Sequence, residues 1–286
     1  MRQALCSLNG RIIPLKKAAI SPYDLGFLRG FGAFDVMRGV GDTPIFLAAH
    51  LKRLRNSLKL LDLAFPLSDA AYRDTVLSLL RKNGFKEAFV RTIVTGGVGS
   101  DTMTPGDNPT ILIMIEERTS YPETHFTKGV KVITLPHARQ LPEAKTSGYV
   151  EALRHANLKR SKKAVEILYR HDGSMLEAST SNLFIVKDGT LITPKDGILH
   201  GITRATVLAI AKKGGIPVEE RPVAEAELRD ADECFLTATG KEVLPVVTID
   251  TKRVGDGRVG EVTKRLLDRY RATVTDAIAK SARHGN

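Results

Sequence analysis

The chain has 286 residues and a formal net charge of +11, with 42% hydrophobic and 26% charged residues, which suits a globular protein of one large or two modest domains. It contains no run of 18 apolar residues and no apolar signal-peptide core near its start, so we expect neither a membrane span nor secretion. Cys6 and Cys234 lie far apart, which predicts a reducing cytoplasm rather than a disulfide framework. The basic residues are scattered and no tryptophan accompanies them, which favours one anionic small-molecule site over nucleic-acid binding.

The first part of the chain, residues 1–119, is predicted to be a small α+β domain. Asn9-Gly10 is typical of a hairpin turn, leucines recur at helical spacing from Leu47 to Leu61, and Ser68 and Gly84 are good start and stop signals for a second helix. The expected elements are a strand pair within 4–13, helices over 47–61 and 69–83, and strands over 89–95 and 110–116.

The second part, residues 129–286, is predicted to be the larger domain, joined to the first by the polar segment 118–128. The expected elements are strands over 130–135, 166–170, 182–186 and 233–238, and helices over 148–163, 204–215 and 260–280. The run Gly255–Gly260 matches the dinucleotide motif G-x-G-x-x-G, but only one helix-like segment follows it. We therefore interpret it as a tight turn before the last helix, and no motif indicates a metal site.

Lys145 is the candidate for chemistry, in the segment LPEAKTSGY. A lysine that reacts as an amine must lose its proton, which burial or a nearby cation promotes. Taken alone the residue remains compatible with a solvated surface lysine, and its meaning depends on the residues that follow in the chain.

Several segments occur in a fixed order around this lysine: RGFGAFDVMR (29–38), HLKRLRNSL (50–58), FVRTIVTGG (89–97), DGSMLEASTSNLF (172–184), LHGITRATV (199–207) and FLTATGKEVLPV (235–246). Together they resemble the class IV, fold-type IV transaminases that use pyridoxal 5′-phosphate (PLP). These include branched-chain aminotransferases, D-amino acid transaminases and aminodeoxychorismate lyase. The resemblance implies an α+β protein of two α/β domains with the cofactor between them.

The resemblance also implies a role for individual residues. Lys145 matches the catalytic lysine that forms a Schiff base with PLP, and Glu177 matches the carboxylate that keeps the pyridine nitrogen protonated. The other residues that match cofactor contacts are Arg53, Ile202, Thr203 and Thr239 at the phosphate, Leu199 on the ring face and Tyr149 near O3′. A solvated helix face remains the alternative for Arg53, and core packing remains the alternative for Tyr149.

The substrate class follows less directly. Phe89 stands where branched-chain enzymes commonly have a tyrosine, and the Arg-x-His pair of one D-amino acid group is absent from TGGVGSD. The best match is a divergent D-amino acid group in which Arg29 and Arg91 would clamp the substrate α-carboxylate. The sequence thus favours transfer from a D-amino acid to a 2-oxo acid. An L-branched-chain aminotransferase, or aminodeoxychorismate lyase, is the alternative. A homodimer is expected, because relatives of this class complete each site with a loop of the neighbouring subunit.

Overall fold

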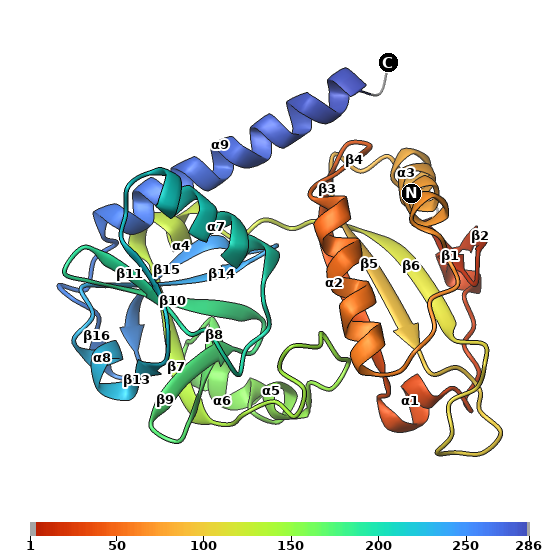
Figure 1. Ribbon diagram of the computed structural model, residues 1–286, viewed down its shortest axis with the longest axis horizontal. Coiled ribbons are helices and arrows are strands. Elements are labelled where there is room, and N and C mark those ends of the chain that lie inside the picture. The colour runs from red at the N-terminus through yellow and green to blue at the C-terminus, as the bar shows by residue number, and fades with distance from the viewer. Residues whose placement is uncertain (1–3, 285–286) are drawn as a thin grey trace. The chain divides into compact units, whose positions relative to one another are not determined.

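The computed structural model describes residues 4–284, with side chains through residue 280, and the chain divides into two compact units (Figure 1). Unit 1 contains the chain up to Thr119, the short segment Ala144–Gly148 and the chain from Thr275 onward. Unit 2 contains Ser120–Glu143 and Tyr149–Val274. Each unit thus combines separate stretches of the chain. The division by sequence into domains 1–119 and 129–286 stays a prediction.

Unit 1 is built on a six-stranded antiparallel sheet in the order β2-β1-β6-β5-β3-β4. The predicted turn at Asn9-Gly10 and the helix from Asp69 to Asn83, capped by Ser68, are confirmed. The elements are β1 (Leu5–Leu8), β2 (Arg11–Pro14), η1 (Leu15–Lys17), α1 (Leu25–Arg29), β3 (Gly32–Val40), β4 (Thr43–Pro44), α2 (Leu47–Leu60), α3 (Asp69–Asn83), β5 (Glu87–Thr95) and β6 (Thr110–Glu117).

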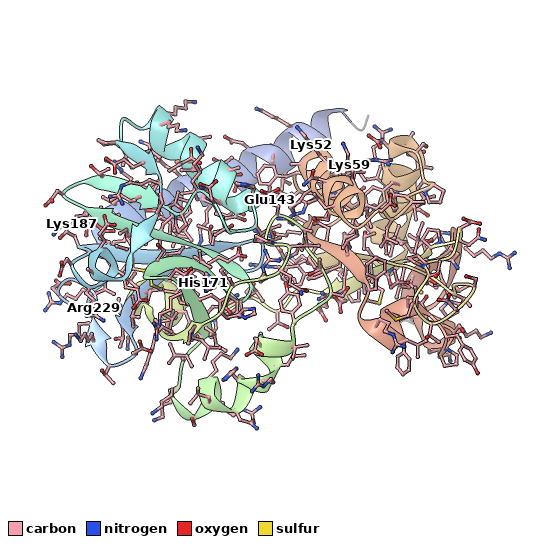
Figure 2. The ribbon with its side chains drawn as sticks, turned by 60° about the horizontal axis from the view of Figure 1, so that its bottom comes forward. Lys52, Lys59, Glu143, His171, Lys187 and Arg229 are labelled. Carbon is pink, nitrogen blue, oxygen red and sulfur yellow. The ribbon has the colours of Figure 1, made fainter. Side chains whose placement is uncertain are left out.

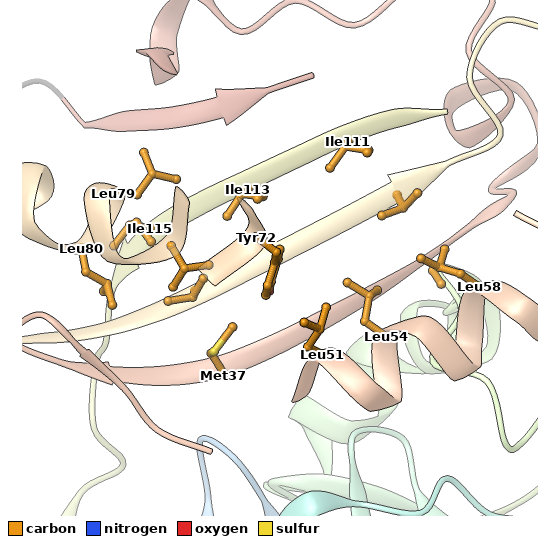
Figure 3. Close-up of a cluster of buried hydrophobic side chains, with 14 of the residues drawn as sticks. Met37, Leu51, Leu54, Leu58, Tyr72, Leu79, Leu80, Ile111, Ile113 and Ile115 are labelled. Atoms are coloured by element: carbon orange, nitrogen blue, oxygen red, sulfur yellow. The ribbon is translucent and has the colours of Figure 1, made fainter. Parts of the chain in front are cut away.

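Helices α2 and α3 cover one face of this sheet and form the core of unit 1 (Figure 3). Alternate residues of β3 and β5 are buried, because successive side chains of a strand point to opposite faces. Leu54 from α2, Tyr72 from α3 and Ile113 from β6 are almost fully buried in this core. The Tyr72 hydroxyl bonds with the Thr92 hydroxyl at 2.8 Å, which satisfies a polar group inside the core. The opposite face of the sheet carries a second, less buried set of side chains.

Unit 2 contains a ten-stranded mixed sheet that closes on itself. Its path runs β12-β11-β10-β14-β15-β7-β8-β9-β13, and β9 also pairs with β10, so the six strands from β10 to β9 form a closed ring. The strands are β7 (Val130–Pro136), β8 (Glu166–His171), β9 (Ser174–Ala178), β10 (Ser181–Lys187), β11 (Thr190–Thr193), β12 (Val218–Glu220), β13 (Val223–Ala224), β14 (Glu233–Ala238), β15 (Glu242–Ile249) and β16 (Lys252–Arg253). The helices are α4 (Glu123–Lys128), α5 (Val150–Arg154), α6 (Ala156–Ser161), α7 (Ile202–Lys213), α8 (Glu225–Arg229) and α9 (Glu261–His284).

Two predicted elements differ from the structure. The expected single helix over 148–163 is two short helices, α5 and α6, because the backbone of His155 leaves the helical range at φ −96° and ψ 10°. The expected irregular connection 118–128 contains the one-and-a-half-turn helix α4, which starts after Pro122. The turn at Gly255 and Gly257, both with positive φ, precedes α9 and confirms that the G-x-G-x-x-G run is a turn.

A buried ion pair joins β8 to the β14–β15 turn in unit 2. Glu166 on β8 contacts Lys241, and the Lys241 ammonium also contacts the hydroxyls of Thr180 and Ser181. Burial opposes ionisation of Glu166, but Lys241 outweighs it and holds the pKa of this carboxyl below its usual value. Because the folded pKa is depressed, this stabilisation is present above the unfolded pKa and is lost as the pH falls through the folded pKa.

We expect Lys241→Met to lower the free energy of unfolding at pH 7 by about 3–5 kcal/mol, because it leaves a buried carboxylate without its cation. The acid limb of the stability profile should move to higher pH, since the pKa of Glu166 rises. Urea unfolding across pH 4–8 measures both effects. The double variant Glu166→Gln/Lys241→Met is the control and should recover much of the loss. A single variant as stable as wild type would show that the pair contributes nothing net.

Candidate active site

Lys145 belongs to a short segment that extends the edge of the unit 1 sheet. Ala33 of β3 forms a bridge with Thr146, and the Phe34 N–H donates to the Lys145 carbonyl at 2.9 Å. The Lys145 N–H donates to Ser57 Oγ at 3.0 Å, and this hydroxyl in turn donates to the Arg53 carbonyl within α2 at 3.0 Å. Lys145 is therefore held by backbone bonds to a strand and to a helix.

The Lys145 ammonium lies 4.6 Å from the centroid of the Phe34 ring. Alternation along β3 directs the Phe34 side chain to the sheet face opposite α2. The strand register defines the rows that follow on this face: Phe34–Ile93–Leu112, then Val36–Arg91–Met114, then Arg38–Phe89–Glu116. The row that includes Phe34 is wholly apolar. The charged side chains of the later rows are paired, Arg91 with Glu116 at 2.8 Å and Arg38 with Glu87 at 2.8 Å.

On the helix side of the same sheet, Arg53 forms a fork with a buried carboxylate. Its Nε donates to Asp35 Oδ2 at 2.8 Å and its Nη2 to Asp35 Oδ1 at 3.0 Å, while His50 Nδ1 donates to Oδ1 at 2.6 Å. Lys52 and Lys59 lie on the exposed side of α2 (Figure 2), but the Arg53 side chain is only 11% exposed. A solvated helix face is therefore not the environment of Arg53.

Glu177 on β9 is a buried carboxylate of unit 2, with a side chain that is 7% exposed. Arg139 Nε donates to its Oε1 at 2.8 Å, and the Leu199 N–H donates to its Oε2 at 3.0 Å. The Asn182 amide donates to the Leu199 carbonyl at 2.6 Å, so Leu199 is fixed through both of its backbone polar groups.

The N-terminus of α7 follows directly after Leu199. Gly201 is its N-cap residue and no side chain caps this end, so the first-turn N–H groups at Ile202 and Thr203 point away from the helix body. A Cβ on Gly201 would lie 2.1 Å from Asn182 Oδ1, so only glycine allows the close approach of helix and strand here. An uncapped helix start attracts anions through its N–H groups and its dipole.

The remaining predicted residues are spread over both units. Thr239 lies in the turn after β14, and the half-buried Tyr149 precedes α5. Arg29 ends α1 and is exposed, and its Nε donates to the Thr102 carbonyl at 3.2 Å. Arg91 is 33% exposed. Within the described residues, no shared partner brings the guanidinium groups of Arg29 and Arg91 together.

Comparison with known proteins identifies the family. The model of the family described as amino-transferase class IV matches residues 32–249. The chain belongs to the class IV aminotransferases. Its curated relatives include a putative branched-chain-amino-acid aminotransferase of Methanocaldococcus jannaschii, 34% identical over 92% of this chain and 94% of the relative. A D-alanine aminotransferase of Listeria monocytogenes is 31% identical over 91% of this chain and 92% of the relative.

Solved structures agree with this aminotransferase assignment. The T.th. branched-chain amino acid aminotransferase with pyridoxamine 5′-phosphate superposes with a TM-score of 0.90, at 28% identity, over 97% of this chain and 96% of that chain. The branched-chain aminotransferase of Thermoproteus uzoniensis with norvaline gives 0.88 at 28% identity, over 96% of each chain. The expected fold-type IV architecture and the expected enzyme class are thus confirmed, and the cofactor is PLP.

The residues of this aminotransferase fit such a cofactor. The uncapped start of α7, the glycine cradle at Gly201 and the buried carboxylate of Glu177 provide donors for a phosphate and an acceptor for a ring N–H. Among the residues that the structure describes, none of the helices combines the length and the apolar character that a membrane span requires.

Four residues of these clusters were missed by the sequence analysis: Asp35, His50, Arg139 and Asn182. Asp35, His50 and Asn182 lie in segments that carry the family resemblance. No sequence spacing indicates that a carboxylate on a strand contacts an imidazole on a helix. Arg139 stands six residues before Lys145, where nothing in the sequence links it to Glu177. Only the folded chain reveals these pairings.

Proposed function

We propose that Lys145 is the catalytic lysine of this aminotransferase. Bound PLP supplies an electron sink that stabilises negative charge at the substrate Cα. The Lys145 amine would hold the cofactor and, as a free amine, would move the proton at the substrate Cα. Its backbone bonds to β3 and α2 support this role, because they fix the position from which the amine works.

We propose that Glu177 accepts a hydrogen bond from the protonated pyridine nitrogen. Arg139 and the Leu199 N–H hold both carboxylate oxygens, so the group is oriented before the cofactor binds. An ionised carboxylate favours the protonated form of a neighbouring ring nitrogen. Leu199 would pack its side chain on the ring face, and its backbone bonds to Glu177 and Asn182 support this role.

The phosphate would be held by Arg53, by the α7 amides at Ile202 and Thr203, and by Thr239, with Tyr149 near O3′. Two observations support this set: the low exposure of Arg53 and the absence of a side-chain cap at Gly201. A dianion is stabilised both by a guanidinium and by a helix N-terminus.

For the substrate we propose an L-branched-chain amino acid as amino donor and a 2-oxo acid as acceptor. The observation that carries this proposal is the apolar row Phe34–Ile93–Leu112, which begins at the ring that the Lys145 ammonium contacts. Branched aliphatic side chains gain free energy by contact with such a surface. The α-carboxylate would then bind near Thr239, and Arg91 would keep Glu116 as its partner.

D-amino acid transfer, which the sequence alone favours, is the second candidate. The relatives of 30–31% identity that are named D-alanine aminotransferases support it, as does the exposed guanidinium of Arg29. In that case Arg29 and Arg91 would bind the α-carboxylate, and Arg91 would do so while one of its edges remains engaged by Glu116.

A single-turnover donor panel separates the two candidates. We expect L-leucine and L-valine to bleach the cofactor absorbance at least about tenfold faster than D-alanine or D-glutamate, because L-donors would place their side chains on the apolar row. Arg91→Ala should change the KM for L-leucine by less than about twofold, since the L assignment gives Arg91 no contact with the carboxylate. Faster bleaching by D-donors, with a KM raised for every D-donor in Arg91→Ala, would transfer the assignment to the second candidate.

We also propose that two copies of the chain associate. Helix α1 and the loop after β5 lie together, because the Leu25 N–H donates to the Gly97 carbonyl and Arg29 to the Thr102 carbonyl. This part of unit 1 exposes five large apolar side chains: Ile20, Tyr23, Phe27, Val98 and Met103. Grouped exposed apolar residues are typical of an interaction surface, and a second copy is the occupant we propose.

Light scattering should give the mass of a dimer, twice 31.2 kDa. Phe27→Asp should shift the mass toward one chain, because it places a charge in the apolar surface. Lys59→Asp, an exposed change on α2, is the control. A fully active wild-type monomer would contradict the proposal.

A further inference from the structure

The fork between Arg53 and Asp35 leaves one edge of the guanidinium unused. Nε and Nη2 both donate to Asp35, while Nη1 donates to no residue in the described range 4–284. An arginine has five N–H donors in a rigid plane, so a carboxylate that binds one edge also fixes the direction of the other edge.

The carboxylate itself is held in place by a second group. Asp35 and His50 are both 2% exposed, and the short bond from Nδ1 to Oδ1 places the imidazole against the oxygen that also receives Nη2. Burial opposes the ionisation of Asp35, but Arg53 and His50 outweigh it and hold the pKa of Asp35 far below its usual value. Burial lowers the pKa of His50, which favours the neutral ring as donor.

We propose that Asp35 and His50 are positioning residues that pre-orient Arg53 for the cofactor phosphate. This inference rests on the proposed role of Arg53. Immobilising a free arginine side chain costs about 2 kcal/mol of rotamer entropy. Because Asp35 already holds Arg53 in the folded chain, this cost falls on folding and not on cofactor binding. The negative charge of Asp35 weakens the attraction between Arg53 and a phosphate dianion. The fork aids binding only if the free energy gained by orienting Arg53 exceeds this weakening.

The same helix couples this device to Lys145. Ser57 donates to the Arg53 carbonyl and accepts from the Lys145 N–H, one turn of α2 after Arg53. The phosphate arginine and the catalytic lysine are therefore held in one rigid register by α2. If Arg53 holds the phosphate of the cofactor, α2 also helps to position Lys145 for the aldehyde at the other end of the cofactor.

The test compares PLP with pyridoxal, which has the same aldehyde but no phosphate. Dissociation constants are measured on the full-length chain by absorbance titration. We expect Asp35→Asn to weaken PLP binding about five- to tenfold, the effect of freeing one long side chain, and to change pyridoxal binding by less than about twofold. His50→Gln should act in the same direction with a smaller effect, about threefold, and it carries the test if Asp35→Asn does not fold. Glu87→Gln, which breaks another carboxylate–arginine pair of the same sheet, is the matched control and should change neither constant.

Arg53→Ala completes a double-mutant cycle. We expect Arg53→Ala to weaken PLP binding about 10- to 150-fold and Asp35→Asn to add nothing further in that background. Equal weakening of PLP and pyridoxal by Asp35→Asn, or tighter PLP binding, would overturn the positioning role. A silent Arg53→Ala would instead refute the phosphate assignment itself, so the two failures are distinguishable.

Discussion

Lys145→Ala should reduce kcat for transamination by at least about 10³-fold and should remove the cofactor signal that borohydride reduction fixes on the protein. The expected size combines the loss of covalent attachment with the loss of a positioned proton carrier, which alone contributes about 10²–10⁴-fold. Steady-state rates with a saturating donor, and the absorbance of the reduced protein, measure the two effects.

The fold should survive this change, because the backbone N–H and carbonyl of residue 145 keep their bonds to Ser57 and Phe34. Lys59→Ala, an exposed lysine on α2, is the control and should retain wild-type kcat. Turnover by Lys145→Ala within tenfold of wild type would remove Lys145 from the mechanism.

Glu177→Gln is expected to lower kcat on the order of 10²-fold, the size typical of removing one electrostatic contact to developing charge. The glutamine amide keeps the shape of the side chain but cannot favour a protonated ring nitrogen. Binding of the cofactor through its phosphate should change little, so kcat should fall much more than cofactor affinity. Both are measured on the same preparations.

Glu225→Gln offers a matched control, because Glu225 also pairs with an arginine of unit 2, Arg170, at 3.1 Å. We expect this variant to keep wild-type kcat. If Glu177→Gln turned over within threefold of wild type, the carboxylate would be a structural partner of Arg139 only.

The parts of the fold that were predicted correctly are those with local signals. Ser68 and Gly84 bound α3 because an N-cap hydroxyl and a left-handed glycine act within one helical turn. The break at His155 has no such signal, and the closed ring in unit 2 depends on a pairing of β9 with β10 that follows from the whole sheet. Periodicity predicts the strands but not their neighbours.

The candidate site shows the same division. The sequence predicts roles for Lys145, Glu177 and Arg53 because whole motifs surround them, whereas the residues that bond to them come from distant segments. Asp35 reaches Arg53 across 18 residues and Arg139 reaches Glu177 across 38. Substrate handedness is harder still, because it depends on which surface receives the carboxylate. Of the two candidate arginines, Arg91 is paired with Glu116, and no sequence pattern reveals that ion pair.

The most direct measurement is the site of covalent attachment. The holoenzyme is reduced with borohydride and digested, and the peptide that carries the cofactor is sequenced by mass spectrometry. We predict a single labelled lysine, Lys145, and loss of the label when an amino donor is added before reduction. A label on Lys241, the buried lysine paired with Glu166, or an unlabelled chain that still transaminates, would contradict the assignment.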